Sequence, residues 1–541
     1  MTPLRILAAA LGECVHVAGI LNFLAVARRH GYLTEFLGPA VPVPALVDEI
    51  RRRGPDVTAI GYRLTPESAA RRFAELGARL TAAGLGGTRL WFGGPQPVAD
   101  VARASGLFEV VFGGPGDPDA ETWFSAAAAG RRVAVARSLL ARRQEAWPRP
   151  LIRHHFGLPS LERTRAGVVR IAEAGVVDVI SLGPDQNAQE YFFAPERMEP
   201  AQDGAGGVPL RSPHDLRSLK EAADVGNHPL LRCYSGTNDL VAWAEMLGDT
   251  IDNAWCAVPV FWYSELDGRS NRSLERAITE NQELARWSAE HGTAVERNDQ
   301  NQWALRSAHD ALQVAAAALA VELSRAVGVR THILQMMLNT PAGISPAMDL
   351  AKMAAMEILA RRAAGPDAQV LTQARAGLFS LPPDPIRALG QLASSVRTAM
   401  ALSPDILHVV GHTEAHHAIE AGELIDACRL ADQVVDDSLL GLPDPMADRR
   451  VAARRDRLIE EASALLDAVR GRFPGAAEGD PSALGAVVRS GLFDAPHLTG
   501  NRAGRGHVIT AVDGACDPID TSTGLTIDEA TRIEALPPLN P

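Results

Sequence analysis

Lysine, cysteine and long apolar runs are scarce in this chain of 541 residues. Lys220 and Lys352 are its only lysines, and we expect both on surface helices, which argues against pyridoxal phosphate or another Schiff-base mechanism. The five cysteines include no CxxC pair, so we expect neither a disulfide framework nor a zinc site. No uncharged stretch approaches about 20 apolar residues, and we therefore expect no membrane span.

Basic residues are also outnumbered, 53 against 65 acidic ones, which gives a net charge of -12. This balance excludes a protein built mainly around nucleic-acid phosphate or anionic lipid. The N-terminus has no basic start followed by a long apolar run, so we expect no signal peptide. We expect a cytoplasmic protein whose partner is a small-molecule substrate, with no nucleic acid and no membrane.

The first 130 residues alternate between strand and helix patterns. The apolar runs 4–11, 56–61, 89–93 and 108–112 each end at glycine, and helical patterns lie between them. Strand, crossover helix and strand in succession predict a doubly wound, flavodoxin-like parallel sheet, whose ligands bind at the carboxyl ends of the strands.

The rest of the chain continues the alternation with longer units, after a linker expected at about 140–150. About eight strands over nearly 400 residues predict a large (β/α)8 barrel of the TIM type. The candidate strands are 177–182, 229–234, 254–262, 293–298, 330–338, 368–373, 405–410 and 507–512. We expect three parts: a domain at 1–140, a barrel at 150–480, and an appendix at 481–541 that completes the barrel domain.

The clearest motif follows the first strand, where His16 stands in the glycine-bounded loop Gly12-Glu-Cys-Val-His-Val-Ala-Gly19. Imidazole is a good transition-metal ligand, and its second ring nitrogen normally donates to a carboxylate that fixes the tautomer. Taken alone, such a histidine is more often a surface or capping residue.

Three spaced elements together resemble the cobalamin-binding domain of corrinoid enzymes, with its Asp-x-His-x-x-Gly loop, Ser-x-Leu strand end and Gly-Gly pair. Here they are His16-x-x-Gly19, then Gly61-Tyr62-Arg63-Leu64, then Gly93-Gly94, about 45 and about 30 residues apart. The resemblance implies that His16 coordinates the cobalt of cobalamin. The nucleotide tail would enter the sheet past Gly61, Tyr62, Arg63, Gly93 and Gly94.

The loop departs from this pattern because Cys14 stands at the position of the aspartate. A thiol is a poor acceptor for an imidazole N–H, so we expect weaker orientation and lower basicity of His16. No serine aligns with the Ser-x-Leu element. An alternative is a degenerate domain that keeps the fold and has lost the cofactor.

Residues 150–541 resemble the catalytic subunit of glutamate mutase (methylaspartate mutase), an adenosylcobalamin-dependent barrel enzyme. The resemblance lies in Leu231–Asp239, Trp255–Leu274, Gly411–His416 and Asn501–Val508. It implies a radical carbon-skeleton isomerase with adenosylcobalamin between the N-terminal sheet and the barrel, and a homodimer. The two parts are usually separate chains, and fusion makes their encounter intramolecular.

The substrate positions implied by this resemblance differ from the family's. Three arginines hold the two carboxylates of glutamate in the family, and His155, Gln189 and Tyr234 match them here. These groups cannot neutralise a dicarboxylate, so we expect a substrate other than glutamate. Arg153 and Arg232 are close enough in sequence to bind its polar ends, or to form ion pairs at the barrel rim.

Further roles also follow from the resemblance. Tyr263 matches the active-site tyrosine, and Asp252 is the only acid near the family's carboxylate beside the substrate amine. With Tyr234 they form the predicted catalytic set, unless the tyrosines are core aromatics. Glu414 matches the glutamate that contacts the cofactor's ribose. Four more polar residues are candidates for substrate contact: Glu296, Asn298, Asp299 and Asn339.

The segment around Glu414 allows two interpretations. On a strand, His412, Glu414 and His416 would share one face and could bind a metal. On a strand-to-helix loop, which the pattern favours, they would contact the ribose and cap the next helix.

Two other functions stay open. One is a corrinoid methyl carrier, and the other is a cobalamin-binding sensor or storage protein with an inactive barrel. Cys14 and the missing arginines favour the second.

Overall fold

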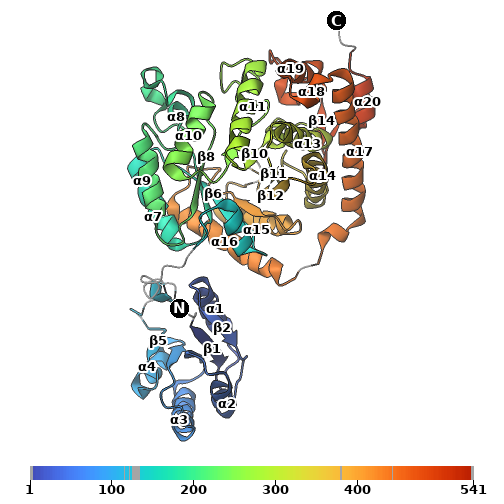
Figure 1. Ribbon diagram of the computed structural model, residues 1–541. Coiled ribbons are helices and arrows are strands. Elements are labelled where there is room, and N and C mark those ends of the chain that lie inside the picture. Colours follow the sequence, from blue (N-terminus) through green and yellow to red (C-terminus); the bar gives the residue numbers. More distant parts are fainter. Residues whose placement is uncertain are drawn as a thin grey trace. The chain divides into compact units, whose positions relative to one another are not determined.

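The computed structural model describes residues 4–114, 116–117, 119–120, 122–124, 135–377, 381–441 and 443–537. The chain divides into two compact units, Met1–Ala134 and Val135–Pro541 (Figure 1). Within the described ranges, no helix combines the length and apolarity that a membrane crossing needs.

The first unit is a five-stranded parallel sheet in the order β2-β1-β3-β4-β5, which confirms the predicted doubly wound, flavodoxin-like fold. Its elements are β1 (Arg5–Ala10), α1 (Ala18–Arg29), β2 (Leu33–Phe36), α2 (Val43–Arg53), β3 (Val57–Gly61), α3 (Pro66–Ala82), β4 (Leu90–Gly93), α4 (Gln96–Ser105) and β5 (Val110–Phe112). The sequence pattern missed β2, because this edge strand is only half buried and has no apolar run.

The sheet of the first unit is buried on both faces. Alternate residues of β1 belong to two apolar clusters, with Ile6 and Ala8 in the one that contains α1, and Leu7 and Ala9 in the one that contains α2, α3 and α4. The register pairs Gly61 with Gly93 and Gly93 with Phe112. The carboxyl ends of β3, β4 and β5 are therefore level.

The second unit contains an eight-stranded parallel sheet in the order β8-β7-β6-β13-β12-β11-β10-β9, a nearly closed barrel that confirms the predicted fold class. Among the described residues, a single backbone hydrogen bond, from Ala254 N to Leu231 O and 2.9 Å long, spans the open edge between β8 and β9. The strands are β6 (Leu151–Phe156), β7 (Val179–Leu182), β8 (Leu230–Cys233), β9 (Cys256–Ala257), β10 (Val295–Arg297), β11 (Thr331–Met337), β12 (Gln369–Arg375) and β13 (Ile406–Val409).

Helices surround this barrel, and most of them cover its outside (Figure 1). They are α6 (Leu139–Ala146), α7 (Leu161–Ala174), α8 (Gln186–Tyr191), α9 (Pro213–Ala223), α10 (Leu240–Ile251), α11 (Leu274–Glu290), α12 (Asp299–Ala304), α13 (Asp310–Ala326), α14 (Pro346–Ala364), α15 (Pro385–Met400) and α16 (Ala421–Leu439). The chain continues through α17 (Arg449–Arg472), α18 (Gly475–Glu478), α19 (Pro481–Ser490), the hairpin β14 (Thr510–Val512) and β15 (Cys516–Pro518), and α20 (Glu529–Glu534).

Two strand assignments from the sequence are wrong. The segment 507–512 contributes β14 to an antiparallel hairpin outside the barrel, and the first barrel strand is β6. The pattern missed β6 because Arg153, His154 and His155 interrupt its apolar residues.

The barrel interior is layered. Its floor is an apolar layer of eight strand or strand-entry residues: Leu151, Val179, Leu230, Trp255, Ala294, Ile333, Leu371 and Ile406. The next inward-facing residues, two positions later on the strand, are polar on seven of the eight strands, and β9 has Ala257 there. The polar residues are Arg153, Ser181, Arg232, Glu296, Gln335, Gln373 and His408, all buried. Branched aliphatic residues usually fill this position in such barrels.

Two further expectations are corrected here. The predicted linker is instead largely helix α6, because Leu139 packs on the barrel floor and buried Arg142 donates to the carbonyl of His228 at 2.8 Å. Lys352 is not on the surface. It is fully buried on α14, where its ammonium lies 3.3 Å from Asp310 and donates to the carbonyl of Thr340 at 2.9 Å.

Candidate functional site

The carboxyl ends of the barrel strands surround a cavity of about 560 Å³. Six residues singled out from the sequence line it: His155, Gln189, Tyr234, Tyr263, Asn298 and Glu414. They come from β6, α8, the loops after β8 and β9, the residue after β10, and the loop after β13. The cavity therefore lies where barrel enzymes carry their active sites.

His155 and Tyr234 form one wall of this cavity. The Tyr234 hydroxyl lies 2.7 Å from His155 Nε2, and the two rings stack at 5.1 Å with an interplanar angle of 11°. Burial and the neighbouring charges of Arg153, Arg375 and Arg232 hold the pKa of His155 well below its usual range. The imidazole is therefore neutral and can accept the Tyr234 hydrogen bond.

Tyr263 is held in an unusual backbone conformation, with φ at 61°. Its N–H donates to Asp267 Oδ2 at 3.1 Å, and its carbonyl accepts from Arg272 Nη2 at 2.7 Å. Burial raises the pKa of its hydroxyl to about 12, so the group is a neutral hydrogen-bond donor near neutral pH. Strained backbone of this kind is concentrated at functional sites.

Two predicted site residues do not reach the cavity. Asp252 follows α10 and precedes β9, at the amino ends of the strands, where its exposed carboxylate pairs with Lys220 at 2.9 Å. Arg232 is fully buried and does not line the cavity, because it occupies the polar layer one step below Tyr234. The structure thus contradicts a direct role for either residue at this cavity.

The four other polar candidates from the sequence lie in different parts of the barrel. Asn298 lines the cavity, whereas Glu296 lies in the buried polar layer. Asp299 holds the chain after β9, because its carboxylate accepts from the N–H groups of Val260 and Phe261. Asn339 is engaged with α14, where its N–H donates to Asp349 Oδ2 at 2.5 Å.

The histidine-rich segment is a loop, since β13 ends at Val409 and α16 begins at Ala421. His417 Nε2 pairs with Glu423 at 3.0 Å, and His416 Nε2 contacts the carbonyl of Pro383. No group of three or more metal-ligating side chains occurs within the described ranges.

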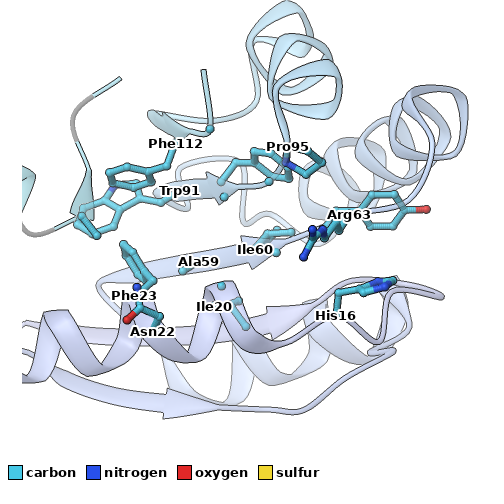
Figure 2. A pocket seen from close by; sticks show the side chains of 18 of the residues that line it. His16, Ile20, Asn22, Phe23, Ala59, Ile60, Arg63, Trp91, Pro95 and Phe112 are labelled. Atoms are coloured by element: carbon cyan, nitrogen blue, oxygen red, sulfur yellow. The ribbon is translucent and has the colours of Figure 1, made fainter. Parts of the chain in front are cut away.

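A second cavity, of about 600 Å³, lies at the carboxyl ends of the first unit's strands (Figure 2). Seven residues singled out from the sequence line it: His16, Gly19, Gly61, Tyr62, Arg63, Gly93 and Gly94. His16 and Arg63 lie at one end of the row of labelled side chains, and α1 runs along one side.

Glycine is required where the strand ends meet in this cavity. A Cβ on Gly94 would lie 2.5 Å from the Tyr62 carbonyl oxygen, and one on Gly113 would lie 1.7 Å from the Gly94 carbonyl oxygen. At Gly19 and Gly93 a Cβ would instead meet no protein atom within 4 Å, so these positions leave the cavity open. The Tyr62 hydroxyl donates to Ser68 Oγ at 2.8 Å.

His16 is exposed, and no described residue forms a hydrogen bond or ion pair with its Nε2. Its Nδ1 lies 4.0 Å from the Sγ of Cys14, which is fully buried and does not itself line the cavity. The nearby Glu13 carboxylate is engaged by Arg72, whose Nε donates to it at 3.1 Å. That hydrogen bond lowers the pKa of Glu13.

The opposite end of the cavity is aromatic, a feature that the sequence analysis missed. Phe23 packs against Trp91 and Phe112, with ring centroids 6.2 and 5.5 Å away (Figure 2). Such a surface suits a flat heteroaromatic base. No motif in the sequence joins Phe23, Trp91 and Phe112, which lie on α1, β4 and β5.

Comparison with known proteins assigns this unit. Residues 4–121 match the B12 binding domain family, and no curated protein matches the chain. A cobalamin-binding protein from Desulfitobacterium hafniense DCB-2 is 21% identical over 24% of this chain, with a TM-score of 0.20, and the chain spans only 59% of that protein. A Rubisco-like protein from Rhodopseudomonas palustris is 15% identical over 58% of this chain and 71% of its own, with a TM-score of 0.32. These TM-scores are too low to support a functional argument.

The residues of the first unit fit the group that the family binds. An exposed imidazole with an uncommitted nitrogen is a suitable cobalt ligand. The glycine-lined cavity with its aromatic end is a suitable slot for a nucleotide tail. Residues 4–121 therefore form a B12-binding domain.

Proposed function

We propose that the protein is an adenosylcobalamin-dependent isomerase, a carbon-skeleton mutase of the glutamate mutase type, acting on a small amino-acid-like or carboxylic substrate other than glutamate. The supporting observation is one chain that joins a B12-binding domain to a barrel with a polar cavity at the carboxyl ends of its strands. Adenosylcobalamin, when bound, supplies a carbon-centred radical that removes an unactivated hydrogen atom.

The chain's own residues bind and orient the substrate in this proposal. Tyr263 donates a hydrogen bond from its neutral hydroxyl, and the His155–Tyr234 pair forms a fixed polar wall. Glu414 contributes a carboxylate at the mouth, where it would contact the cofactor's ribose. The apolar barrel floor closes the lower end against water.

Transfer of label from the cofactor tests the isomerase directly. The full chain is incubated without oxygen with adenosylcobalamin deuterated at the adenosyl 5′ carbon and with a panel of small amino and carboxylic acids. Mass spectrometry should find deuterium in one recovered acid. Cobalamin retained without any exchange would instead support the sensor or storage protein that Cys14 favours.

We expect Tyr263→Phe to lower this exchange at least about 100-fold, because the phenolic donor would be lost from the cavity. The fold should be preserved, since the backbone contacts of Tyr263 do not involve its hydroxyl. Asp252→Asn is the matched control and should exchange at the wild-type rate, because Asp252 lies at the other end of the barrel. Equal effects of the two variants would contradict the assignment of Tyr263.

Cys14→Asp should raise the fraction of bound cobalamin that is ligated by His16. The carboxylate would accept the Nδ1 hydrogen that the thiol at 4.0 Å accepts poorly. Loss of such a partner usually costs about 10- to 100-fold in metal affinity, and its gain should have the opposite sign. The absorption spectrum of the bound cobalamin measures this fraction. An unchanged spectrum would show that Cys14 does not control His16.

A further inference from the structure

The arginines in and directly below the barrel cavity lie at two depths. Arg153 and Arg232 belong to the buried polar layer, and neither lines the cavity. Arg269 and Arg375 line the cavity itself. Among the described lining residues, the single carboxylate is that of Glu414. The cavity therefore carries an excess of positive charge near neutral pH.

The two buried arginines share one counter-charge, Glu296, although Nη2 of Arg153 and Nε and Nη1 of Arg232 have no hydrogen-bond partner. Arg153 Nη1 lies 3.0 Å from Glu296 Oε2 and donates to Gln373 Oε1 at 2.6 Å. Arg232 Nη2 lies 3.4 Å from the same Glu296 oxygen, and its guanidinium carbon is 4.1 Å from the Tyr234 ring centroid. A ligand in the cavity would meet Tyr234 before it met Arg232.

The three residues that match the family's arginines, His155, Gln189 and Tyr234, line the cavity but offer no cation to a second carboxylate. His155 and Tyr234 are hydrogen-bonded to each other, and His155 is neutral. Gln189 Nε2 donates to the carbonyl of Pro184 at 2.8 Å. A carboxylate placed there would lose its hydration without gaining an ion pair, which is costly in a partly buried site.

Arg375 differs from the two buried arginines because it lines the cavity. It is the last residue of β12, it is half-buried, and its Nε is buried without a hydrogen-bond partner. No described carboxylate forms an ion pair with it. The other lining arginine, Arg269, is exposed and lies 5.4 Å from the Tyr263 ring centroid, so solvent screens its charge.

We propose that Arg375 anchors one carboxylate of the substrate, and that the cavity selects monocarboxylates over dicarboxylates. That the bound acid is a substrate rests on the proposed function, whereas the binding of the acid to Arg375 does not. The guanidinium would hold the carboxylate through paired N–H donors. The His155–Tyr234 wall would face an uncharged part of the ligand.

Binding of two matched acids to the full chain tests this proposal without adenosylcobalamin. Pentanoate and glutarate have the same number of carbons and differ in the second carboxylate. Ligand-observed NMR titration gives a Kd for each acid. We expect pentanoate to bind at least tenfold more tightly than glutarate, and Arg375→Gln to weaken pentanoate at least tenfold. Arg375→Lys should recover part of the loss, and Arg362→Gln, on the exposed last turn of α14, should change nothing.

Several results would overturn the proposal. One is equal or tighter binding of glutarate, and another is pentanoate binding that Arg375→Gln leaves intact. A loss on Arg269→Gln instead of Arg375→Gln would move the anchor to the exposed arginine. Binding as expected, with no label exchange for any acid, would leave this inference standing and defeat the proposed isomerase.

Discussion

His16→Ala should retain cobalamin in the first unit and change its absorption spectrum to that of the form without a lower imidazole ligand. The reason is geometric, because His16 lies at the end of the cavity opposite its aromatic rings with an uncommitted Nε2, while the glycine-lined slot does not depend on its side chain. The purified full chain is incubated with adenosylcobalamin and desalted, and its ultraviolet–visible spectrum is recorded beside the variant's.

Val15→Ala is the matched control for this measurement. Val15 belongs to the same loop and is 62% exposed, so its truncation should leave the spectrum unchanged. Identical spectra for the wild type and His16→Ala would show that His16 is not the lower ligand. Loss of corrinoid from the wild type on desalting would contradict cobalamin binding at this cavity.

The site of the first unit was largely predictable, because its residues are identified by their place relative to the strands and not by side-chain contacts. His16, Gly61 and Gly93 each stand directly after or at the end of a strand, and parallel strands bring such ends to one edge of the sheet. Cys14 is buried next to His16, as the motif spacing requires. The aromatic end of the slot was missed, because Phe23, Trp91 and Phe112 have no shared motif in sequence.

The barrel site was less predictable, because the order of residues along a strand does not show which inward-facing side chain reaches the cavity and which lies below it. Arg232 and Tyr234 both point inward, two residues apart, yet only Tyr234 reaches the cavity. Asp252 illustrates the related error at a strand boundary, since it precedes β9 and so lies at the opposite end of the barrel.

The place of Arg375 at the cavity could have been predicted from the sequence. The predicted strand 368–373 ends two residues too early, whereas β12 continues to Arg375. Extending the inward series Leu371, Gln373, Arg375 by one more step would have placed a guanidinium at the mouth. A polar residue at the end of an apolar run makes the predicted strand too short. The same residue, at the carboxyl end of a barrel strand, is a candidate for the site.

Glu296→Gln should destabilise the barrel unit by about 3–5 kcal/mol, the usual cost of removing one partner from a buried ion pair. Glu296 is fully buried, and its Oε2 accepts from Trp255 Nε1 at 2.6 Å and faces both Arg153 and Arg232. Burial alone would raise the pKa of this carboxyl, but the two arginines outweigh burial and lower it, so Glu296 is ionised. Its neutral replacement would leave two buried guanidinium groups without a counter-charge.

Urea unfolding of the full chain, followed by circular dichroism, measures this loss in the transition of the helix-rich second unit. Glu322→Gln is the matched control, because Glu322 pairs with Arg470 at 2.8 Å on the partly exposed outer surface and should change stability by less than about 1 kcal/mol. Arg232→Met should cost less than Glu296→Gln, since Glu296 would keep Arg153 as its partner. Equal small effects of Glu296→Gln and Glu322→Gln would mean that water or a bound anion compensates the arginines, and that the polar layer is not held together by this one carboxylate.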